Sequence, residues 1–188
     1  MKECRVGTLD VGRFLILSPC LDEETMEAIR NAPKPDTVAG VPVPDSLDIV
    51  KVGQFIELSE IRTDYDLLFV PCRELLRMSD AEITGAKVYE VYGFAAWCVR
   101  EVGRIAGLFA QCRVEPTAEE VQAGIGRMDY GWPGLADYYA RRMGIHDPDY
   151  VLKRVGILKL WLALKIDADS RKFERRLSEI VNKKMKRI

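Results

Sequence analysis

One amphipathic stretch, residues 86–111, constrains the fold of this chain more than any other. Apolar side chains recur in it at alternating spacings of three and four residues: Val88, Val91, Ala95, Cys98, Val102, Ile105 and Phe109. This spacing places them on one face of a helix, as in a helix that faces the core of a globular bundle. A coiled-coil seam between two chains is the alternative, which the lack of consistent flanking charges over three heptads disfavours.

Capping patterns predict where further helices begin. Ser79 and Glu82 have the spacing of a capping box, and Thr117 and Glu120 repeat it. Asp22 has the side chain of an N-cap at the start of another helix. Together with the long stretch, these signals predict a mainly α protein with about five to seven helices in a bundle-like domain.

Residues 116–167 are predicted to form three helices separated by two corners. The turn YGWPG at 130–134 is expected to break the first helix, and Gly144 to end the second in a left-handed conformation. Asp147 as N-cap and Pro148 at the first helical position are expected to start the third.

The first 45 residues depart from this helical pattern. Residues 13–17 form a short run with β-branched and aromatic side chains, which predicts a strand that pairs with 4–9 across a tight turn. Four prolines and a glycine between positions 33 and 44 exclude regular structure there. That segment is interpreted as a solvated connector or as an arm that docks on a neighbour.

The predicted organisation therefore has three parts, within the size of one domain and a small appendage. Residues 1–32 form a strand/helix appendage, 33–45 a Pro-rich linker or arm, and 46–188 a helical domain. Pro71 is expected to divide two short helices or to stand at the first position of the second. The fold class is mainly α, with or without a small N-terminal β-hairpin.

The overall charge favours no particular class of partner, since the 28 Lys and Arg residues nearly balance the 29 Asp and Glu residues. The N-terminus lacks the basic start and apolar core of a signal peptide. The longest apolar runs are too short to cross a bilayer. No membrane partner is expected, and the cytoplasm is the expected location.

The C-terminal segment is amphipathic and basic, and it is expected to follow a helix–helix corner at Asp167 and Asp169. Residues 171–188 carry eight cations and two anions, which suits the negative end of a helix dipole. One narrow apolar face is made by Phe173, Leu177, Ile180, Val181 and Met185. No series of aromatic side chains is interleaved as a stacking platform for bases requires, so nucleic acid is not an expected partner.

Few residues have the types and spacing that catalysis or metal binding needs. The five cysteines contain no C-x-x-C pair and His146 is the single histidine, so no zinc site is expected. Asp147 is better used as an N-cap than as an orienting partner for His146. Cys98 lies on the predicted core face and is expected to be buried and inert. No catalytic residue, cofactor or metal ion is predicted.

The candidate binding residues are aromatic and arginine side chains around the corner at 130–134: Tyr130, Trp132, Tyr138, Tyr139 and Arg142. Such side chains anchor many protein interfaces. The alternative, compatible with the first, is that Trp132 and a tyrosine fill the gap between two short helices. Because the corner is expected to be rigid, Trp132→Ala should cost a complex about 2 kcal/mol or more, and these residues should matter more than the basic tail.

Two segments resemble the tail assembly chaperones of tailed bacteriophages. The first is SLDIVKVGQFIEL at 46–58, which is similar to a linker and helix near the start of those proteins. The second is the YGW corner at 130–132, followed by DYVL at 149–152 and the apolar helix to Leu164. The resemblance covers about residues 45–188. It implies a small helical, non-enzymatic protein that binds the tape-measure protein while the tail tube polymerises.

The expected function is accordingly a non-enzymatic binding and assembly factor for a helical client such as a tape-measure protein, with self-association as the other option. For a phage-encoded chain, the location would be the host cytoplasm. A permanent virion component, such as a connector or ring subunit, is one alternative. An intracellular enzyme of unknown chemistry is the other.

Overall fold

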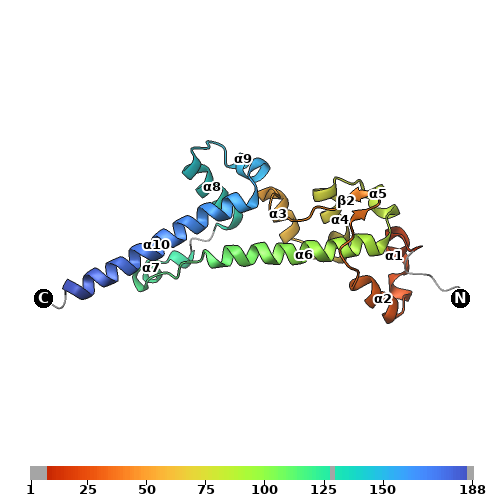
Figure 1. Ribbon diagram of the computed structural model, residues 1–188, viewed down its shortest axis with the longest axis horizontal. Helices are drawn as coiled ribbons and strands as arrows, with labels where there is room; N and C mark the ends of the chain where they lie inside the picture. The colour runs from red at the N-terminus through yellow and green to blue at the C-terminus, as the bar shows by residue number, and fades with distance from the viewer. Residues whose placement is uncertain (1–7, 128–129, 186–188) are drawn as a thin grey trace. The chain divides into compact units, whose positions relative to one another are not determined.

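The computed structural model describes residues 8–127 and 130–185 (Figure 1). Over these residues the fold is mainly α, as predicted, with a two-stranded antiparallel sheet. None of the helices described there combines the length and the apolar content that a membrane-spanning segment requires.

Contacts divide the chain into two compact units that do not follow sequence order. Unit 1 comprises residues 1–47 and 54–103, and unit 2 comprises 48–53 and 104–188. Helix α6 (Val88–Gln111) gives its first part to unit 1 and its end to unit 2. The predicted division into appendage, arm and helical domain concerns independent folding, and it stays a prediction.

Unit 1 consists of short elements packed with the first part of α6. In chain order they are α1 (Val11–Leu17), η2 (Ser18–Cys20), α2 (Glu23–Arg30), β1 (Thr37–Val38), β2 (Val41–Pro42), most of α3 (Val52–Ser59), α4 (Asp64–Leu76) and α5 (Asp80–Gly85). Along α6, Val88, Val91, Ala95 and Cys98 are buried. The prediction of a core-facing helix is confirmed for this part of the chain.

The Pro-rich segment packs on α6 instead of running free as a connector. A Cβ added to Gly93 would lie 2.2 Å from the carbonyl oxygen of Pro33, so only glycine permits this close approach of the two backbones. The ammonium of Lys34 lies 4.4 Å from the centre of a Trp97 ring, within the range of a cation–π contact.

The same segment holds the β structure of unit 1. Strands β1 and β2 pair antiparallel, with Val38 opposite Val41. Ala39 and Gly40 form the turn with φ of 47° and 82°, the geometry of a two-residue hairpin. The amide of Ala39 donates to the carboxylate of Glu90 on α6 at 3.1 Å. The expectation of no regular structure here was wrong, because a tight turn joins two strands of two residues each, and Pro42 itself belongs to β2.

Residues 13–17, predicted as a strand, belong to helix α1. The Asp10 side chain accepts an amide hydrogen bond at 2.7 Å and caps the helix. Val11 and Phe14 are buried on one face, and the rest of the apolar run is exposed. The strand prediction was wrong because it used the composition of the run without the cap before it. The partner strand predicted at 4–9 lies mainly outside the described residues.

Pro71 lies inside α4, so the predicted division of this region at Pro71 was wrong. The helix begins after the N-cap Thr63 and ends at Arg77 in a left-handed conformation. A proline removes one backbone hydrogen bond from a helix interior. Pro71 is nevertheless buried on the same helix face as Leu68 and Cys72, and burial of that face offsets the lost bond.

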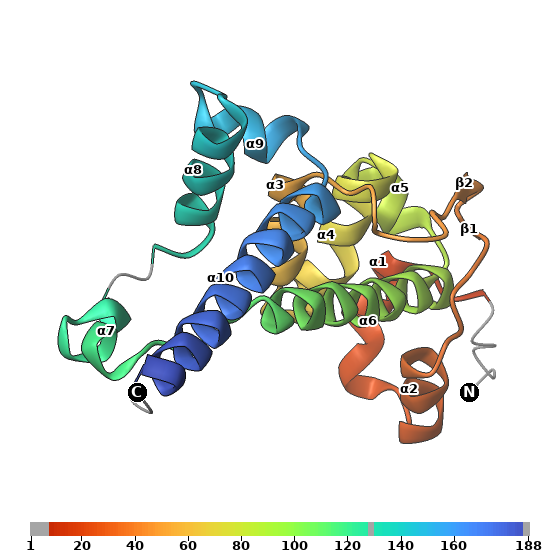
Figure 2. The same ribbon diagram turned by 60° about the vertical axis from the view of Figure 1, so that its left-hand side comes forward.

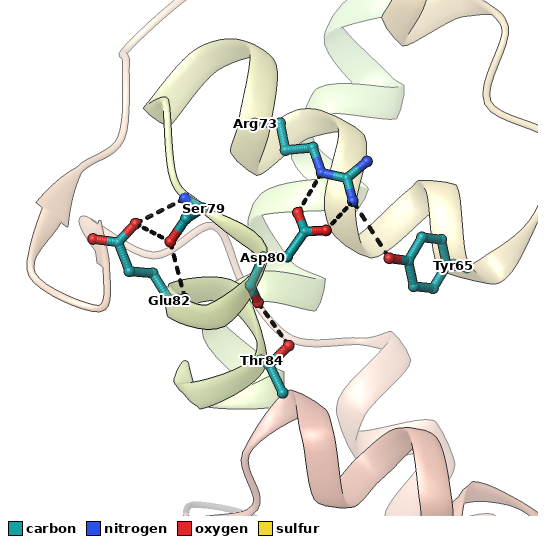
Figure 3. A network of polar contacts seen from close by, with 6 residues as sticks. All are labelled: Tyr65, Arg73, Ser79, Asp80, Glu82 and Thr84. Atoms are coloured by element: carbon teal, nitrogen blue, oxygen red, sulfur yellow. Dashed lines mark hydrogen bonds and ion pairs between the residues drawn. The ribbon is translucent and has the colours of Figure 1, made fainter.

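A polar network holds the corner between α4 and α5 (Figure 3). Arg73 donates through Nε and Nη2 to both carboxylate oxygens of Asp80, at 2.6 and 2.7 Å, and Nη2 also donates to the Tyr65 hydroxyl at 3.3 Å. The hydrogen bond from Arg73 lowers the pKa of the Asp80 carboxyl below its ordinary value. Ser79 and Glu82 form the predicted capping box at the start of α5.

Unit 2 contains α7 (Ala118–Gln122), η3 (Ile125–Arg127), α8 (Gly131–Met143), α9 (Pro148–Arg154) and α10 (Ile157–Met185). Three predicted signals are confirmed: the Thr117 capping box, the left-handed C-cap at Gly144 and the N-cap at Asp147. The predicted turn at 130–134 was wrong, because α8 already begins at Gly131.

Helices α9 and α10 are separated by Val155 and Gly156. Val155 has extended backbone angles, and its carbonyl accepts the amide of Val52 at 2.9 Å. The amide of Ile157 in turn donates to the carbonyl of Val50 at 2.8 Å. This strand-like pairing ends α9, so the third predicted helix is in fact two helices.

Helix α10 then continues without interruption to Met185 (Figure 2). The corner predicted at Asp167 and Asp169 was wrong, since both residues lie inside α10. Asp169 pairs with Lys165 one helical turn earlier. Asp167 faces α8, as described below.

Candidate functional site

Trp132 and Tyr130 lie at the start of α8, where the sequence predicted a binding corner. The Tyr130 side chain is 69% exposed. Trp132 is half-buried, and its ring meets the Phe109 ring edge to face, with centroids 5.7 Å apart. The structure therefore places Trp132 against the end of α6 within unit 2.

Tyr138 and Arg142 converge on one carboxylate. The Tyr138 hydroxyl donates to Asp167 of α10, and the Arg142 guanidinium pairs with the other oxygen of the same carboxylate. Arg142 also donates to the Tyr138 hydroxyl at 3.2 Å. These contacts tie α8 to α10, and both side chains are already engaged within unit 2.

Tyr139 is buried with its neighbours Ala136 and Ala140, on the α8 face that packs into unit 2. Among the five predicted binding residues, Tyr130 is thus the most exposed, and the others have packing or polar partners inside the unit. Their role in binding a partner stays a prediction.

The residues considered for catalysis were His146 with Asp147 in unit 2 and Cys98 in unit 1. His146 is exposed in the α8–α9 loop, where Asp147 accepts the amide of Asp149 at 2.9 Å. Burial raises the pKa of the Cys72 thiol to about 12 and raises that of Cys98 further. In the described part of the chain, no group of three or more His, Cys, Asp or Glu side chains is placed to hold a metal ion.

The sequence analysis identified only part of a prominent exposed surface of unit 2, which lies on α10. Five large apolar side chains there are each between 48% and 60% exposed: Leu162, Ile166, Phe173, Leu177 and Ile180. At 100° per residue they fall within about 60° of the helix circumference, and they extend over roughly 27 Å of its length. We refer to these five residues as the α10 stripe.

The buried face of α10 lies on another side of the helix. Ile157, Leu160, Ala163 and Ala168 are buried there. The Trp161 indole N–H donates to the carbonyl of Leu108 at 3.0 Å. The helix therefore has one apolar face that unit 2 covers and a second, the α10 stripe, that it leaves in solvent.

One side of the α10 stripe is basic. Lys165, Lys172, Arg176 and Lys183 follow it at helical spacing, and we refer to them as the basic flank. Lys172 donates to the carbonyl of Gln111 at 3.1 Å, and Arg176 donates to the carbonyl of Lys172 at 3.2 Å. These backbone acceptors carry no net charge, so the two hydrogen bonds do not compensate the charges of Lys172 and Arg176.

The cations of this flank lower the pKa of Asp169. Its carboxyl pKa is lowered first by the hydrogen bond from Lys165 and then by attraction from Lys165, Lys172 and Arg176. Beside the flank, an open hollow of about 580 Å³ is lined by Arg113, Val114, Glu115, Lys172, Arg175 and Arg176. Four of these six residues are cations.

The sequence contained part of this signal. Phe173, Leu177 and Ile180 were recognised as an apolar face, but the corner assigned to Asp167 and Asp169 separated them from Leu162 and Ile166. Reading the segment as one helix would have joined all five at spacings of three, four and seven residues.

Comparison with protein-family models, with curated proteins and with solved structures finds no match for this chain. The resemblance to tail assembly chaperones therefore stays a prediction.

Proposed function

We propose that this protein is a non-enzymatic binding and assembly factor that holds a helical segment of a client protein on the α10 stripe. The observation that supports the proposal is the row of five half-exposed apolar side chains on one face of α10. Single exposed apolar residues are common on protein surfaces, but aligned ones mark interaction sites.

The geometry of the α10 stripe suits a helix better than a flat surface. An amphipathic helix packs along a second helix by placing its apolar side chains between those of the first. The α10 stripe is long enough for about five turns of such contact. A tape-measure-like client, which is long and helical, is a partner of this kind.

The tail assembly chaperone resemblance names one biological setting for this activity. The alternative of a permanent virion component relied on the arm at 33–44 and the strands at 1–20 reaching into neighbouring subunits. In unit 1, Pro33 and Lys34 instead contact α6 of the same chain. We therefore favour transient binding of a client over permanent incorporation.

A synthetic helix tests the proposal directly. The probe is a fluorescein-labelled peptide of about 18 residues, with leucines on one face and neutral glutamines beside them, matched in length to the α10 stripe. We expect saturable binding in fluorescence anisotropy. Leu177→Glu should weaken it by at least about tenfold, because a charge would be placed in the apolar contact.

The matched control is Asn182→Glu, which adds the same charge at an exposed position on another side of α10. It should bind the peptide like the unmodified protein. Equal binding by both variants, or no binding of the peptide by the unmodified protein, would contradict the proposal.

The same assay compares the α10 stripe with the aromatic corner. The sequence predicts that Trp132→Ala costs a complex about 2 kcal/mol or more. The α10 proposal expects Leu177→Glu to have the larger effect of the two. A thermal melt of Trp132→Ala is needed beside the binding curve, because loss of its contact with Phe109 also affects packing.

A further inference from the structure

We propose that the helix held on the α10 stripe carries carboxylates along one side and belongs to a protein other than a second copy of this chain. The inference rests on the proposed function and adds the chemistry of the partner. It is carried by the unequal charge on the two sides of the stripe.

The basic flank gives one side of the stripe a positive surplus. Its four cations lie near two carboxylates, Asp169 within the row and Glu179 behind it. The neighbouring hollow adds Arg113 and the carboxylate of Glu115, whereas Arg175 there is paired with Glu120. A partner helix seated on the stripe would run along this row for most of its length.

The opposite side of the stripe has a different character. Ser170 and Glu174 lie there between the two ends, with Lys159 and Lys184 near the ends themselves. A helix that lies in an anionic membrane surface generally carries cations across its polar face. Between the ends of the stripe the cations lie on one side only, which suits a protein partner whose carboxylates are also on one side.

Charge also disfavours a second copy of α10 as the occupant. In an antiparallel pair, like flanks face each other, so Lys172 and Arg176 would oppose their own counterparts. In a parallel pair, the basic flank would face the side with Ser170, where Glu174 is the nearest carboxylate. Neither arrangement compensates the row of cations, whereas an acidic helix compensates it along its whole length.

Part of the hollow is already committed to internal contacts, which keeps its walls in place. Arg175 donates to the Glu120 carboxylate at 2.9 and 3.2 Å and also to the Glu115 carbonyl. Lys172 and Arg176 donate to backbone carbonyls and attract the Asp169 carboxylate electrostatically. These last two cations are therefore the ones we expect to meet the carboxylates of the partner.

The experiment compares three labelled peptides with the same leucine face and with glutamate, glutamine or lysine beside it. We expect the glutamate peptide to bind about tenfold more tightly than the glutamine peptide at low salt, and the lysine peptide to bind most weakly. The advantage of glutamate should shrink at high salt, because exposed charges are screened.

Lys172→Glu combined with Arg176→Glu should reverse the order of the glutamate and lysine peptides. The control is Lys153→Glu combined with Arg154→Glu on α9, which changes the net charge equally at exposed positions. The control should keep the original order. Circular dichroism of both variants checks that the helices are intact.

The outcomes separate this inference from the proposed function. Equal affinity for the glutamate and glutamine peptides would overturn the inference and leave helix binding standing, whereas no binding of any peptide would overturn both. Binding to phosphatidylserine vesicles without peptide binding would point to a membrane surface instead. A dimer in sedimentation that Leu177→Glu dissociates would show a second copy on the stripe, which also overturns the inference.

Discussion

Helices α6 and α10 carry the same kind of apolar periodicity, and the structure uses it in opposite ways. Along the first part of α6, Val88, Val91 and Ala95 are fully buried. Along α10, Phe173 and Ile180 are more than half exposed. A periodic apolar face therefore indicates that something should cover it, but not whether the cover comes from the same chain.

The two helices differ in whether other segments of the chain pack on their apolar faces. The α6 face is met by segments distant in sequence, including the Pro33 backbone at Gly93 and the hairpin amide at Glu90. The α10 stripe has apolar side chains at a helical spacing similar to that of the α6 face, but they are exposed to solvent. Four predictions test how firmly this contrast holds, in order of decreasing effect on the free energy of unfolding.

The largest effect, and the largest difference between the two helices, should come from truncating a buried phenylalanine of α6 and an exposed one of α10. Phe94 is fully buried on α6 and stacks on Trp97 at 5.9 Å, so Phe94→Ala should destabilise the protein by about 3–5 kcal/mol. Phe173 is 60% exposed, and Phe173→Ala should change stability by less than about 0.5 kcal/mol.

Urea unfolding followed by circular dichroism measures both changes. A large loss of stability in Phe173→Ala would mean that the α10 stripe is covered in solution. That result would remove the contrast between the two helices.

The next effect uses two glycines of α6 that differ only in their surroundings. Gly93→Ala should destabilise by about 1–3 kcal/mol, because its Cβ would meet the Pro33 carbonyl at 2.2 Å and the backbone must shift. Gly107 has open space around it, so Gly107→Ala should stabilise by roughly 0.5–1 kcal/mol through helix propensity. Thermal melts that moved in the same direction for both variants would show that the Pro-rich segment does not pack on α6.

A smaller effect, about 1 kcal/mol each, is expected from removing the two capping boxes. Ser79→Ala removes the cap of α5 in unit 1, and Thr117→Ala removes the cap of α7 in unit 2. Hydrogen exchange should show the loss of protection mainly in the unit that carries the change. Loss spread equally over both units in both variants would indicate a single cooperative unit.

The smallest effect is a pH dependence from the buried thiols of unit 1. Burial raises the pKa of Cys72 to about 12 and that of Cys98 further, whereas an exposed thiol ionises near pH 8.5. The folded state therefore binds the proton more tightly than the unfolded state. The resulting stability is fully present below about pH 8 and declines as the pH rises, by less than about 1 kcal/mol per thiol at pH 9.

Urea unfolding at pH 7 and pH 9 measures this decline. The double variant Cys72→Ala, Cys98→Ala serves as the control, since it is less stable overall but should lose less stability between the two pH values. An equal decline in the variant and in the unmodified protein would mean that other groups account for it.

Local signals in the sequence were enough for much of the helical framework. The capping boxes at Ser79 and Thr117, the left-handed Gly144 and the cap at Asp147 act within a few residues, so they could be predicted without knowledge of the fold. The long helix α6 was predicted from the spacing of its own apolar residues. The predictions that failed at residues 13–17 and Pro71 assigned structure from composition alone, where a cap or a buried face decided otherwise.

The candidate site was less predictable because its contacts join distant parts of the chain. Tyr138 and Arg142 were identified as residue types that anchor interfaces, yet both meet Asp167 on another helix. The α10 stripe was visible only in part, since its exposure depends on which face of α10 unit 2 covers.

The sequence by itself determined where several helices begin or end and which of their faces are apolar, because capping and periodicity are properties of neighbouring residues. Only the tertiary structure decided that the α6 face would be covered and that the α10 stripe would not. A helix face is covered by segments that are distant in sequence, as Pro33 covers Gly93. Tertiary packing, and not the local sequence pattern, decides which segments pack there.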